Sequence, residues 1–389
     1  MLRRVRIQNF KSFQDATIEL GLRNFLVGPN MSGKSNFIRL FGFLQQLAFP
    51  KPGVWGVANA FTGGFFEWTW KGGDSNLIRI ALDGTMPEPL GRASVQWTYE
   101  LAVVGDERGS IRVQDESLTR EFEDRSVQLI LTRAGNRSLV NHDGREVYSS
   151  LDAARSALEF EIPDWEGAFL RPSIASWHFY HLVPMIMRQF NPAATPPFLN
   201  EFGDNLSAWL MSLQTKYAES FVKIQQVCRD VLPGVTDLFT SPTQQATVAL
   251  GSRERYLKRP ISLWEMSDGE LAFVALLSLI FVPLDLGASL YCVEEPENYL
   301  HPKLIETVIE LLHQEQAQLG PSSSAQVIAT THSAHLIDKV SLDELIVFER
   351  RQGATVVTYP KNKAHLRELL QSEELGLGDL FYSGALHSG

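Results

Sequence analysis

Cysteine is scarce in this chain, which has only Cys228 and Cys292 among its 389 residues. The two lie far apart in apolar surroundings, and no Cys-x-x-Cys pair is present. This excludes a disulfide framework, a zinc ribbon and a zinc hook. Such sparse cysteine usage fits proteins of a reducing compartment, so we expect a cytoplasmic location.

Positive charge is also in deficit. The formal net charge is -10, which argues against a surface that binds DNA over its whole extent. A local basic groove is still compatible with this value. Basic residues gather in two clusters, Arg3, Arg4, Arg6 and Lys11, and Arg253, Arg255, Lys258 and Arg259. We interpret both clusters as solvated strand edges and loops.

Long hydrophobic runs are missing as well. The most apolar stretch, residues 271–284, is shorter than the roughly 20 residues that cross a bilayer, and it runs into Asp285. A helix that is apolar all round is typical of a protein core, so we expect no membrane partner. Residues 1–7 hold no apolar stretch of signal-peptide length. Internal repeats and heptads long enough for a coiled coil are also lacking.

A glycine-rich motif stands out against these absences. Residues 28–35 match the pattern G-x-x-x-x-G-K-S, between a strand expected at 24–27 and a helix expected at 34–48. In such a loop the backbone N–H groups cradle phosphates, the lysine reaches the β and γ phosphates, and the serine hydroxyl binds Mg²⁺. The motif predicts that ATP is bound by Gly28, Pro29, Asn30, Met31, Ser32, Gly33, Lys34, Ser35 and Asn36.

A pair of acids lies far downstream. Glu294 and Glu295 follow an apolar strand expected at 289–293, and Pro296 ends that strand. One carboxylate is placed to hold Mg²⁺ together with Ser35, and the second to polarise the attacking water. The alternative interpretation, an acidic surface turn, fits less well beside a phosphate loop.

Two further motifs complete the set. Ser267 and Gly269 open an apolar helix at the spacing of a capping box with Glu270, which can be an ordinary helix start or part of an anion site. His332 follows a strand expected at 326–330, where it can sense the γ-phosphate or be a plain loop histidine. We interpret His178, His181, His301 and His335 as structural or surface residues.

The pattern of apolar and polar residues changes along the chain and divides it into segments. Short alternating runs at 66–70, 77–81, 93–102 and 127–131 predict an antiparallel β meander, helices are expected to dominate 151–232, and strands return over 235–262. Helices are then expected at 268–281 and 302–318, strands at 344–348 and 355–359, and a closing helix. The expected segments are an N-terminal head part (1–48), a β subdomain (49–150), a helical insertion (151–234) and a C-terminal head part (235–389).

The order of these motifs resembles an ABC-type ATPase head. Asn9-Phe-Lys-Ser-Phe13, the phosphate loop, Ser267-Asp-Gly-Glu270, Glu294-Glu-Pro-Glu-Asn-Tyr-Leu-His-Pro302 and Thr330-Thr-His-Ser333 resemble the RecF/SMC-like branch, above all the OLD (overcoming lysogenization defect) family and its bacterial-defence relatives. The resemblance is specific over 1–48 and 260–340. It implies an α/β fold, a P-loop NTPase head with a mixed sheet and helices that carries inserted antiparallel β and helical subdomains.

The resemblance also implies a site shared between two copies. In a head-to-tail ATP-sandwich dimer, Lys34, Glu294, Glu295 and His332 of one subunit would meet Ser267 and Gly269 of the other. Met266 stands where the family usually has leucine, and Glu294 where ABC proteins usually have aspartate. The glutamine that normally contacts magnesium has no clear counterpart, and Gln96 is only a candidate.

The resemblance leaves the biological role open among alternatives. Residues 333–389 are too short for the TOPRIM nuclease domain of OLD nucleases, so we expect a stand-alone ATPase. The leading hypothesis is the switch or scaffold of an anti-phage defence or toxin–antitoxin system, with a separate effector protein such as a nuclease or toxin. The rivals are a RecF-like repair ATPase that binds DNA and a non-hydrolysing scaffold. A transporter subunit fits least, because the phosphate loop and the Ser267 segment are too far apart.

Overall fold

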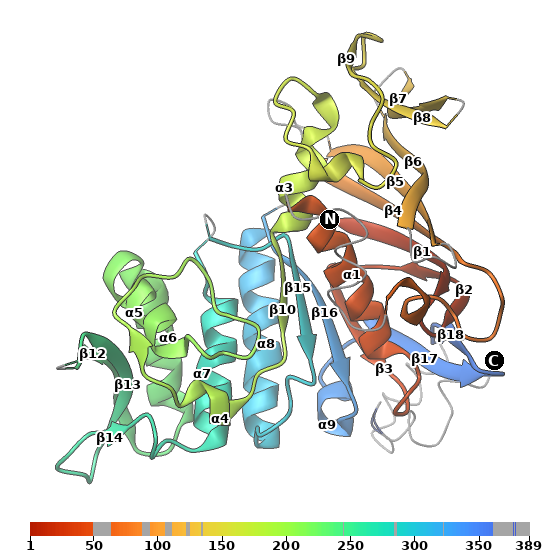
Figure 1. Ribbon diagram of the computed structural model, residues 1–389. Coiled ribbons are helices and arrows are strands. Elements are labelled where there is room, and N and C mark those ends of the chain that lie inside the picture. Colours follow the sequence, from red (N-terminus) through yellow and green to blue (C-terminus); the bar gives the residue numbers. More distant parts are fainter. Residues whose placement is uncertain are drawn as a thin grey trace. The chain divides into compact units, whose positions relative to one another are not determined.

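The computed structural model describes residues 1–49, 64–87, 94–105, 111–121, 125–133, 135–243, 245–283, 286–321 and 323–360, with Gly376 and Gly378. The chain forms two compact units (Figure 1). The first comprises residues 1–177, 326–328 and 344–360, and the second comprises residues 178–325, 329–343 and 361–389. The expected closing helix lies outside the described residues.

An eight-stranded antiparallel sheet dominates the first unit, in the order β2-β1-β4-β5-β6-β7-β8-β9. Its strands are β1 (Leu2–Phe10), β2 (Phe13–Glu19), β4 (Leu77–Pro87), β5 (Ser94–Gly105), β6 (Ile111–Glu121), β7 (Ser126–Arg133), β8 (Asn136–Val140) and β9 (Glu146–Tyr148). In β1 the buried Val5 and Ile7 alternate with exposed arginines, as the sequence predicts. Val5 pairs with Leu82 and Ile7 with Ile80.

This pairing changes how the β meander relates to the head. Because β4 pairs directly with β1, the strands after residue 77 extend the sheet that the N-terminal strands begin. The N-terminal strands and the β meander therefore share one sheet.

The prediction of a strand at 66–70 is wrong. A 3-10 helix, η1 (Phe65–Glu67), occupies this place and is followed by a turn. Trp68 is buried against Phe10 and Phe43, with ring centroids 5.6 and 5.5 Å away, whereas Phe66 is exposed. The aromatic alternation thus reflects one anchoring ring and not a strand.

A second group of strands carries the phosphate-loop motif. In the first unit β3 (Arg23–Val27) pairs in parallel with β17 (Leu345–Arg351), which pairs with β18 (Ala354–Thr358). Helix α1 spans Lys34–Ala48, as its apolar spacing predicts. It buries Phe37 against Phe348 of β17, with ring centroids 5.9 Å apart. This aromatic core fixes the end of β3 and the start of α1.

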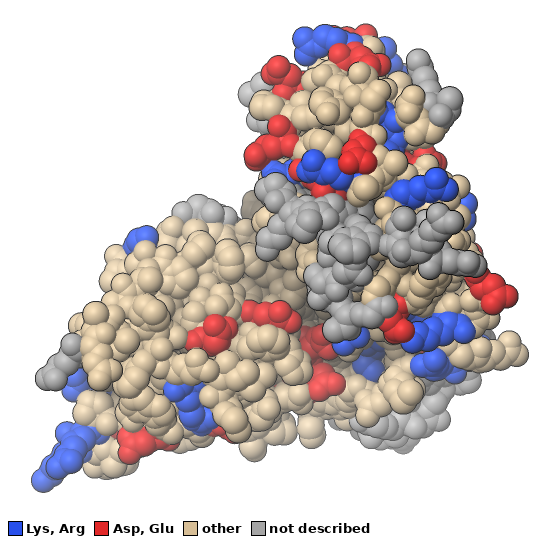
Figure 2. All heavy atoms as spheres, in the orientation of Figure 1, with Lys and Arg blue, Asp and Glu red and all other residues tan. Residues whose placement is uncertain are grey.

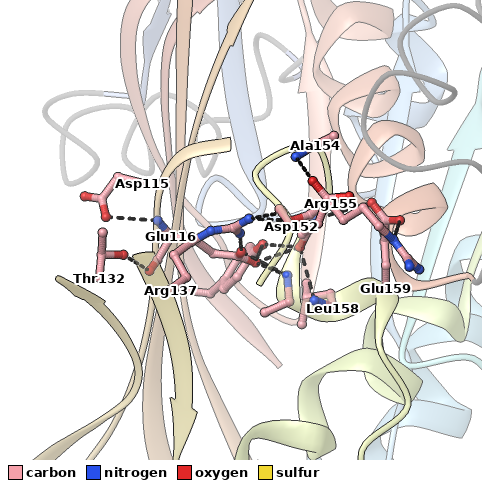
Figure 3. A network of polar contacts seen from close by, with 12 residues as sticks. Asp115, Glu116, Thr132, Arg137, Asp152, Ala154, Arg155, Leu158 and Glu159 are labelled. Carbon is pink, nitrogen blue, oxygen red and sulfur yellow. Dashed lines mark hydrogen bonds and ion pairs between the residues drawn. The ribbon is translucent and has the colours of Figure 1, made fainter. Parts of the chain in front are cut away.

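A buried ion pair ties the far end of the antiparallel sheet to the segment that follows it (Figure 3). Arg137 of β8 pairs with Glu116 of β6, and both side chains are almost fully buried. The Arg137 guanidinium also donates to the carbonyl oxygens of Asp152 and Arg155, each at 2.6 Å. Glu116 accepts from the Ser156 hydroxyl at 2.6 Å. Every charged group in this network therefore has hydrogen-bonding partners, as burial requires.

The second unit contains β10 from residue 178, β15 and the second half of β16, with α7 and α8. A smaller sheet, β11-β13-β12, packs on α5 and α6, and β14 pairs with β13. The bounds of these elements are β10 (Trp177–Tyr180), α4 (Pro184–Met187), β11 (Asn191–Pro192), α5 (Leu206–Lys216), α6 (Ala218–Val231), β12 (Val235–Pro242), β13 (Thr247–Glu254), β14 (Ile261–Ser262), α7 (Asp268–Ile280), β15 (Leu290–Glu294), α8 (Pro302–Leu319), β16 (Gln326–Thr331) and α9 (Ala334–Ile337).

Helix content between 151 and 205 is lower than expected. This stretch holds the short helices η2 (Ala157–Glu159), η3 (Glu166–Phe169), α3 (Leu170–Ala175) and α4, along with β10, β11 and loops. The apolar helix α7 is a core helix, since all residues from Leu271 to Leu279 are buried. Among the helices in the described part of the chain, none has the length and apolar character that a membrane span requires.

Candidate functional site

The phosphate loop joins β3 to α1 within the first unit. Gly28 and Gly33 have φ angles of 150° and 111°, in the region that favours glycine. A Cβ atom on Gly28 would lie 2.1 Å from the Phe348 carbonyl oxygen, and one on Gly33 would lie 2.2 Å from Thr355 Oγ1. Glycine is thus required at both positions by backbone conformation and by space.

Two distant residues hold the loop in place. Thr355 of β18 donates from its hydroxyl to the Ser32 carbonyl oxygen at 2.8 Å, and its backbone N–H donates to the Ser12 carbonyl oxygen at 2.7 Å. Asn36 of α1 donates to Ser12 Oγ at 2.9 Å. Ser12 lies in the Asn9–Phe13 motif that contributes to the family resemblance, which now has a structural explanation.

The ammonium group of Lys34 closes over the loop. Its Nζ donates to the carbonyl oxygens of Gly28 and Pro29 at 2.7 and 3.0 Å, and the residue is only 6% exposed. The N-terminus of α1 has neither a capping side chain nor an acid in its first turn. The helix therefore leaves its first N–H groups without a local side-chain acceptor, which favours an anion there.

An open hollow of about 420 Å³ adjoins the loop. Its wall includes Lys11, Ser12, Asn36, Trp70 and Arg350. Lys11 Nζ lies 4.5 Å from the centroid of the Trp68 ring. Burial, and then the nearby Arg39, lower the pKa of Lys11. Trp70 and Arg350 lie outside the glycine-rich motif, so no sequence signal marks them as neighbours of the loop.

The acid pair and the histidine meet in the second unit. Glu294 ends β15, and Glu295 follows it with a φ of 47°, a left-handed backbone conformation. The Glu295 N–H donates to the carbonyl oxygen and to Oγ1 of Thr330, both at 3.1 Å. His332 Nε2 lies 3.7 Å from Glu295 Oε1. The neighbouring strands β15 and β16 thus bring together Glu295 and His332, which lie 37 positions apart.

A third acid, Glu297, holds the backbone beside His332 in place through hydrogen bonds. Its Oε1 accepts from the Thr331 hydroxyl at 2.7 Å and from the His332 backbone N–H at 2.9 Å. Asn298 donates to Glu295 Oε2 at 2.8 Å. Glu297 and Asn298 both belong to the Glu294–Pro302 motif, but the sequence alone does not reveal these contacts.

Glu201 is a further acid near β15. Burial raises the pKa of Glu201, and the Glu294 carboxylate raises it further. The Glu201 carbonyl oxygen accepts from the N–H of His181, the residue that follows β10, at 2.9 Å.

His178 packs against Phe198, with ring centroids 4.6 Å apart, and burial lowers the pKa of His178 to about 4. Both observations support the structural interpretation of this histidine.

Ser267 caps α7, as the spacing predicts. The Glu270 N–H donates to Ser267 Oγ at 3.2 Å, and the Ser267 N–H donates to Glu270 Oε2 at 2.6 Å. A Cβ atom on Gly269 would lie 3.0 Å from the Tyr299 carbonyl oxygen. Ser267 is therefore a helix cap, as the first of the two interpretations predicts. It is also exposed at the helix N-terminus.

Arg188 anchors this segment and was missed by the sequence analysis. Its guanidinium donates to Asp268 Oδ1 at 2.5 Å and to the Met266 carbonyl oxygen at 2.6 Å. These two bonds bracket Ser267 from outside its own helix. A lone arginine after a short helix gives no sequence signal of such a contact.

The residues of the phosphate loop fit the phosphate groups of a nucleotide. Ser32 Oγ is buried within the loop and has no hydrogen-bonding partner among the described residues. With the Lys34 ammonium group and the uncapped start of α1, it forms a cradle suited to phosphate oxygens. Clusters of three or more His, Cys, Asp or Glu side chains arranged to hold a metal by themselves are absent from the described residues. Gln96, the candidate magnesium contact, lies in β5 opposite Thr85 and is exposed.

Comparison with known proteins places the fold. Residues 23–338 match the protein family described as "AAA domain, putative AbiEii toxin, Type IV TA system". No curated protein matches the chain.

Solved structures of SMC heads share the architecture. A structure of SmcHead bound to the C-winged helix domain of ScpA matches with a TM-score of 0.56 at 13% identity, covering 94% of this chain and 99% of that one. A Pyrococcus furiosus Smc head domain with an extended coiled coil, bound to the C-terminal domain of ScpA, matches with a TM-score of 0.51 at 12% identity, covering 96% and 99%. The expected fold class, an ABC-type ATPase head, is confirmed.

Proposed function

We propose, from the premise that this chain belongs to the AbiEii-type AAA-domain family, that it binds and hydrolyses ATP with Mg²⁺ as a dimer. The observation that carries this proposal is the phosphate loop. Two glycines that nothing larger can replace, a buried lysine ammonium group and an uncapped helix start surround a buried hydroxyl that has no partner among the described residues.

Residues of the loop would bind the nucleotide. Lys34 would exchange its bonds to the Gly28 and Pro29 carbonyl oxygens for bonds to phosphate oxygens, and the N–H groups of residues 28–36 would complete the cradle. The hollow beside Ser12 and Trp70 offers a place for the nucleoside, with an aromatic face for the base. Ser35 and Glu294 would hold Mg²⁺, which when bound supplies positive charge against the phosphate oxygens.

Glu295 would act as the general base. A water molecule attacks the γ-phosphorus, the bond to the β-phosphate oxygen breaks, and the proton of the water passes to the Glu295 carboxylate. The Asn298 amide donates to Oε2 of that carboxylate, and the Glu297 carboxylate accepts from the backbone N–H of His332. His332 would sense the γ-phosphate, and Ser267 and Gly269 of a second copy would complete the site.

We further propose that ATP turnover operates a switch. The family description, which names a toxin–antitoxin system, supports a role in bacterial defence or in a toxin–antitoxin pair with a separate effector. In cells that also express the separate effector, Lys34→Ala should abolish control of that effector's toxicity. Unchanged control in that variant would reject the switch.

Glu295→Gln is the sharpest test of the chemistry. We expect turnover to fall by roughly 10²–10⁴-fold, as for loss of a general base, while ATP affinity measured by calorimetry stays close to that of the wild type. Glu219→Gln, an exposed acid on α6 of the same unit, is the matched control and should behave as wild type. Unchanged turnover in Glu295→Gln would reject the role of this carboxylate.

A further inference from the structure

The turn that joins β13 to β14 is an exposed hairpin end in the second unit. We call Arg255, Tyr256, Leu257, Lys258 and Arg259 the basic tip; all five are exposed, Tyr256 by 86% and Leu257 by 51%. The hairpin is paired at its base, Gly251 with Ser262 and Ser252 with Ile261. The Arg255 N–H also donates to the Gly234 carbonyl oxygen at 2.9 Å. The tip is thus a defined projection that carries a large aromatic ring into solvent.

Within the part of the chain that the structure describes, the cations of the basic tip are not paired with an acid. Arg255, Lys258 and Arg259 form no ion pair and no side-chain hydrogen bond with any residue that the structure describes. Arg253, just before them, lies 3.9 Å from Asp237. Figure 2 shows Lys and Arg atoms at the projection where Figure 1 draws the β13–β14 hairpin. On a chain with a net charge of -10, this is a local positive site for a polyanion.

We propose that the basic tip binds the phosphate backbone of a nucleic acid, with the Tyr256 ring stacking on an accessible base. Three unpaired cations within five residues match closely spaced phosphates, which release counterions when the cations replace them. An exposed aromatic ring among arginines is the combination that binds unpaired bases by stacking. An acidic protein surface would also satisfy the cations, but a nucleic acid supplies planar bases directly beside its phosphates, which suits an aromatic ring placed among cations.

The tip is linked to Ser267 by hydrogen-bonded turns. Ser262 ends β14, and its carbonyl oxygen accepts from the N–H groups of Glu265 and Met266 at 2.9 and 3.2 Å. The Ser262 hydroxyl donates back to Glu265 Oε2 at 3.0 Å. Occupancy of the tip can therefore shift the segment that presents Ser267, so nucleic acid should alter ATP turnover. This coupling rests on the proposed ATPase function, whereas binding at the tip does not.

Charge reversal tests the binding. The variant carries Lys258→Glu and Arg259→Glu, and the matched control carries Lys216→Glu and Arg229→Glu, two exposed cations on α5 and α6 of the same unit. Both variants change the net charge equally. Anisotropy of a fluorescein-labelled DNA, as duplex and as single strand, is titrated over a range of KCl concentrations without nucleotide.

We expect the slope of log affinity against log salt to fall by about 2 in the tip variant, since each lost phosphate contact removes about 0.9, and to stay unchanged in the control. Equal slopes in the two variants, or no DNA affinity in the wild type, would overturn the proposal. Polyglutamate that competes as well as unlabelled DNA would identify an acidic protein surface as the partner and would also overturn it.

A second pair of variants tests the stacking. Tyr256→Ala should weaken single-strand binding by roughly 5-fold to 100-fold, as for loss of one base–aromatic stack, and Tyr256→Phe should retain it. Equal binding by both would reject the ring contact. Turnover of ATP with and without DNA tests the coupling. If DNA binds at the tip of a chain that hydrolyses no ATP, the proposed function fails and the tip assignment stands.

Discussion

At the scale of single residues, the Glu116–Arg137 pair makes a prediction about stability. Both side chains are almost without solvent contact, 0% and 2% exposed, so Arg137→Met leaves a buried carboxylate without its cation. We expect the free energy of unfolding in urea to fall by about 3–5 kcal/mol. The double variant Glu116→Gln, Arg137→Met should be less destabilised than the single variant, because no charge is left buried. A double variant as unstable as the single one would contradict this explanation.

The same scale shows what a motif can and cannot predict. The glycine-rich pattern predicts glycine at positions 28 and 33, and the structure gives the reason, since both have positive φ angles and a Cβ atom at either would clash. Ser12 and Thr355 hold the same loop across 343 positions of sequence. No local pattern reveals such a contact, because it exists only when β1, β2 and β18 have assembled.

At the scale of elements, strong periodicity predicted well and aromatic alternation did not. Helices α1, α7 and α8 lie within one or two residues of their expected bounds, since each has a long apolar stripe or a cap. The stretch 151–205 has a capping box at Ser156 but no long apolar stripe, and it folds into short helices, short strands and loops that rest on other elements. Trp165, for example, donates from its ring N–H to the Leu129 carbonyl oxygen of β7 at 3.1 Å.

Arg188 connects two elements and gives a prediction about turnover. Because its guanidinium holds Asp268 and the Met266 carbonyl oxygen, Arg188→Ala should loosen the start of α7 and lower kcat for ATP by roughly tenfold through misplacement of Ser267. Nucleotide affinity, which we assign to the phosphate loop, should change little. Arg188→Lys should give an intermediate kcat, because lysine cannot donate as a fork.

The readouts that separate positioning from folding are kcat and the dissociation constant, measured on the same preparations as thermal melts. Arg229→Ala, which removes an exposed arginine of α6, is the control and should match the wild type in all three. If Arg188→Ala instead loses affinity in proportion to kcat, this arginine does not act through Ser267.

At the scale of the whole molecule, the candidate residues fall into two groups. The phosphate loop belongs to the first compact unit, whereas Glu294, Glu295, His332, Ser267 and Gly269 belong to the second. The sequence order of the motifs predicted this fold class correctly, and the strand, glycine-rich loop and helix follow one another as that order requires. The resemblance to the OLD branch and the dimer stay predictions.

The ATP-sandwich dimer can be tested with the cap of α7 left intact. Aspartate and asparagine both cap helices as well as serine, but only aspartate would bring a negative charge to the phosphates of a second copy. In a Glu295→Gln background that retains ATP, light scattering should show a dimer with ATP and Mg²⁺ and a monomer without nucleotide. Adding Ser267→Asp should leave a monomer, and adding Ser267→Asn should keep the dimer.

Other outcomes of this experiment separate the rival dimers. A dimer that forms equally with ADP would favour the scaffold in which nucleotide acts only as structural glue, because the γ-phosphate would then contribute nothing to assembly. A dimer that survives Ser267→Asp would place its interface away from the start of α7.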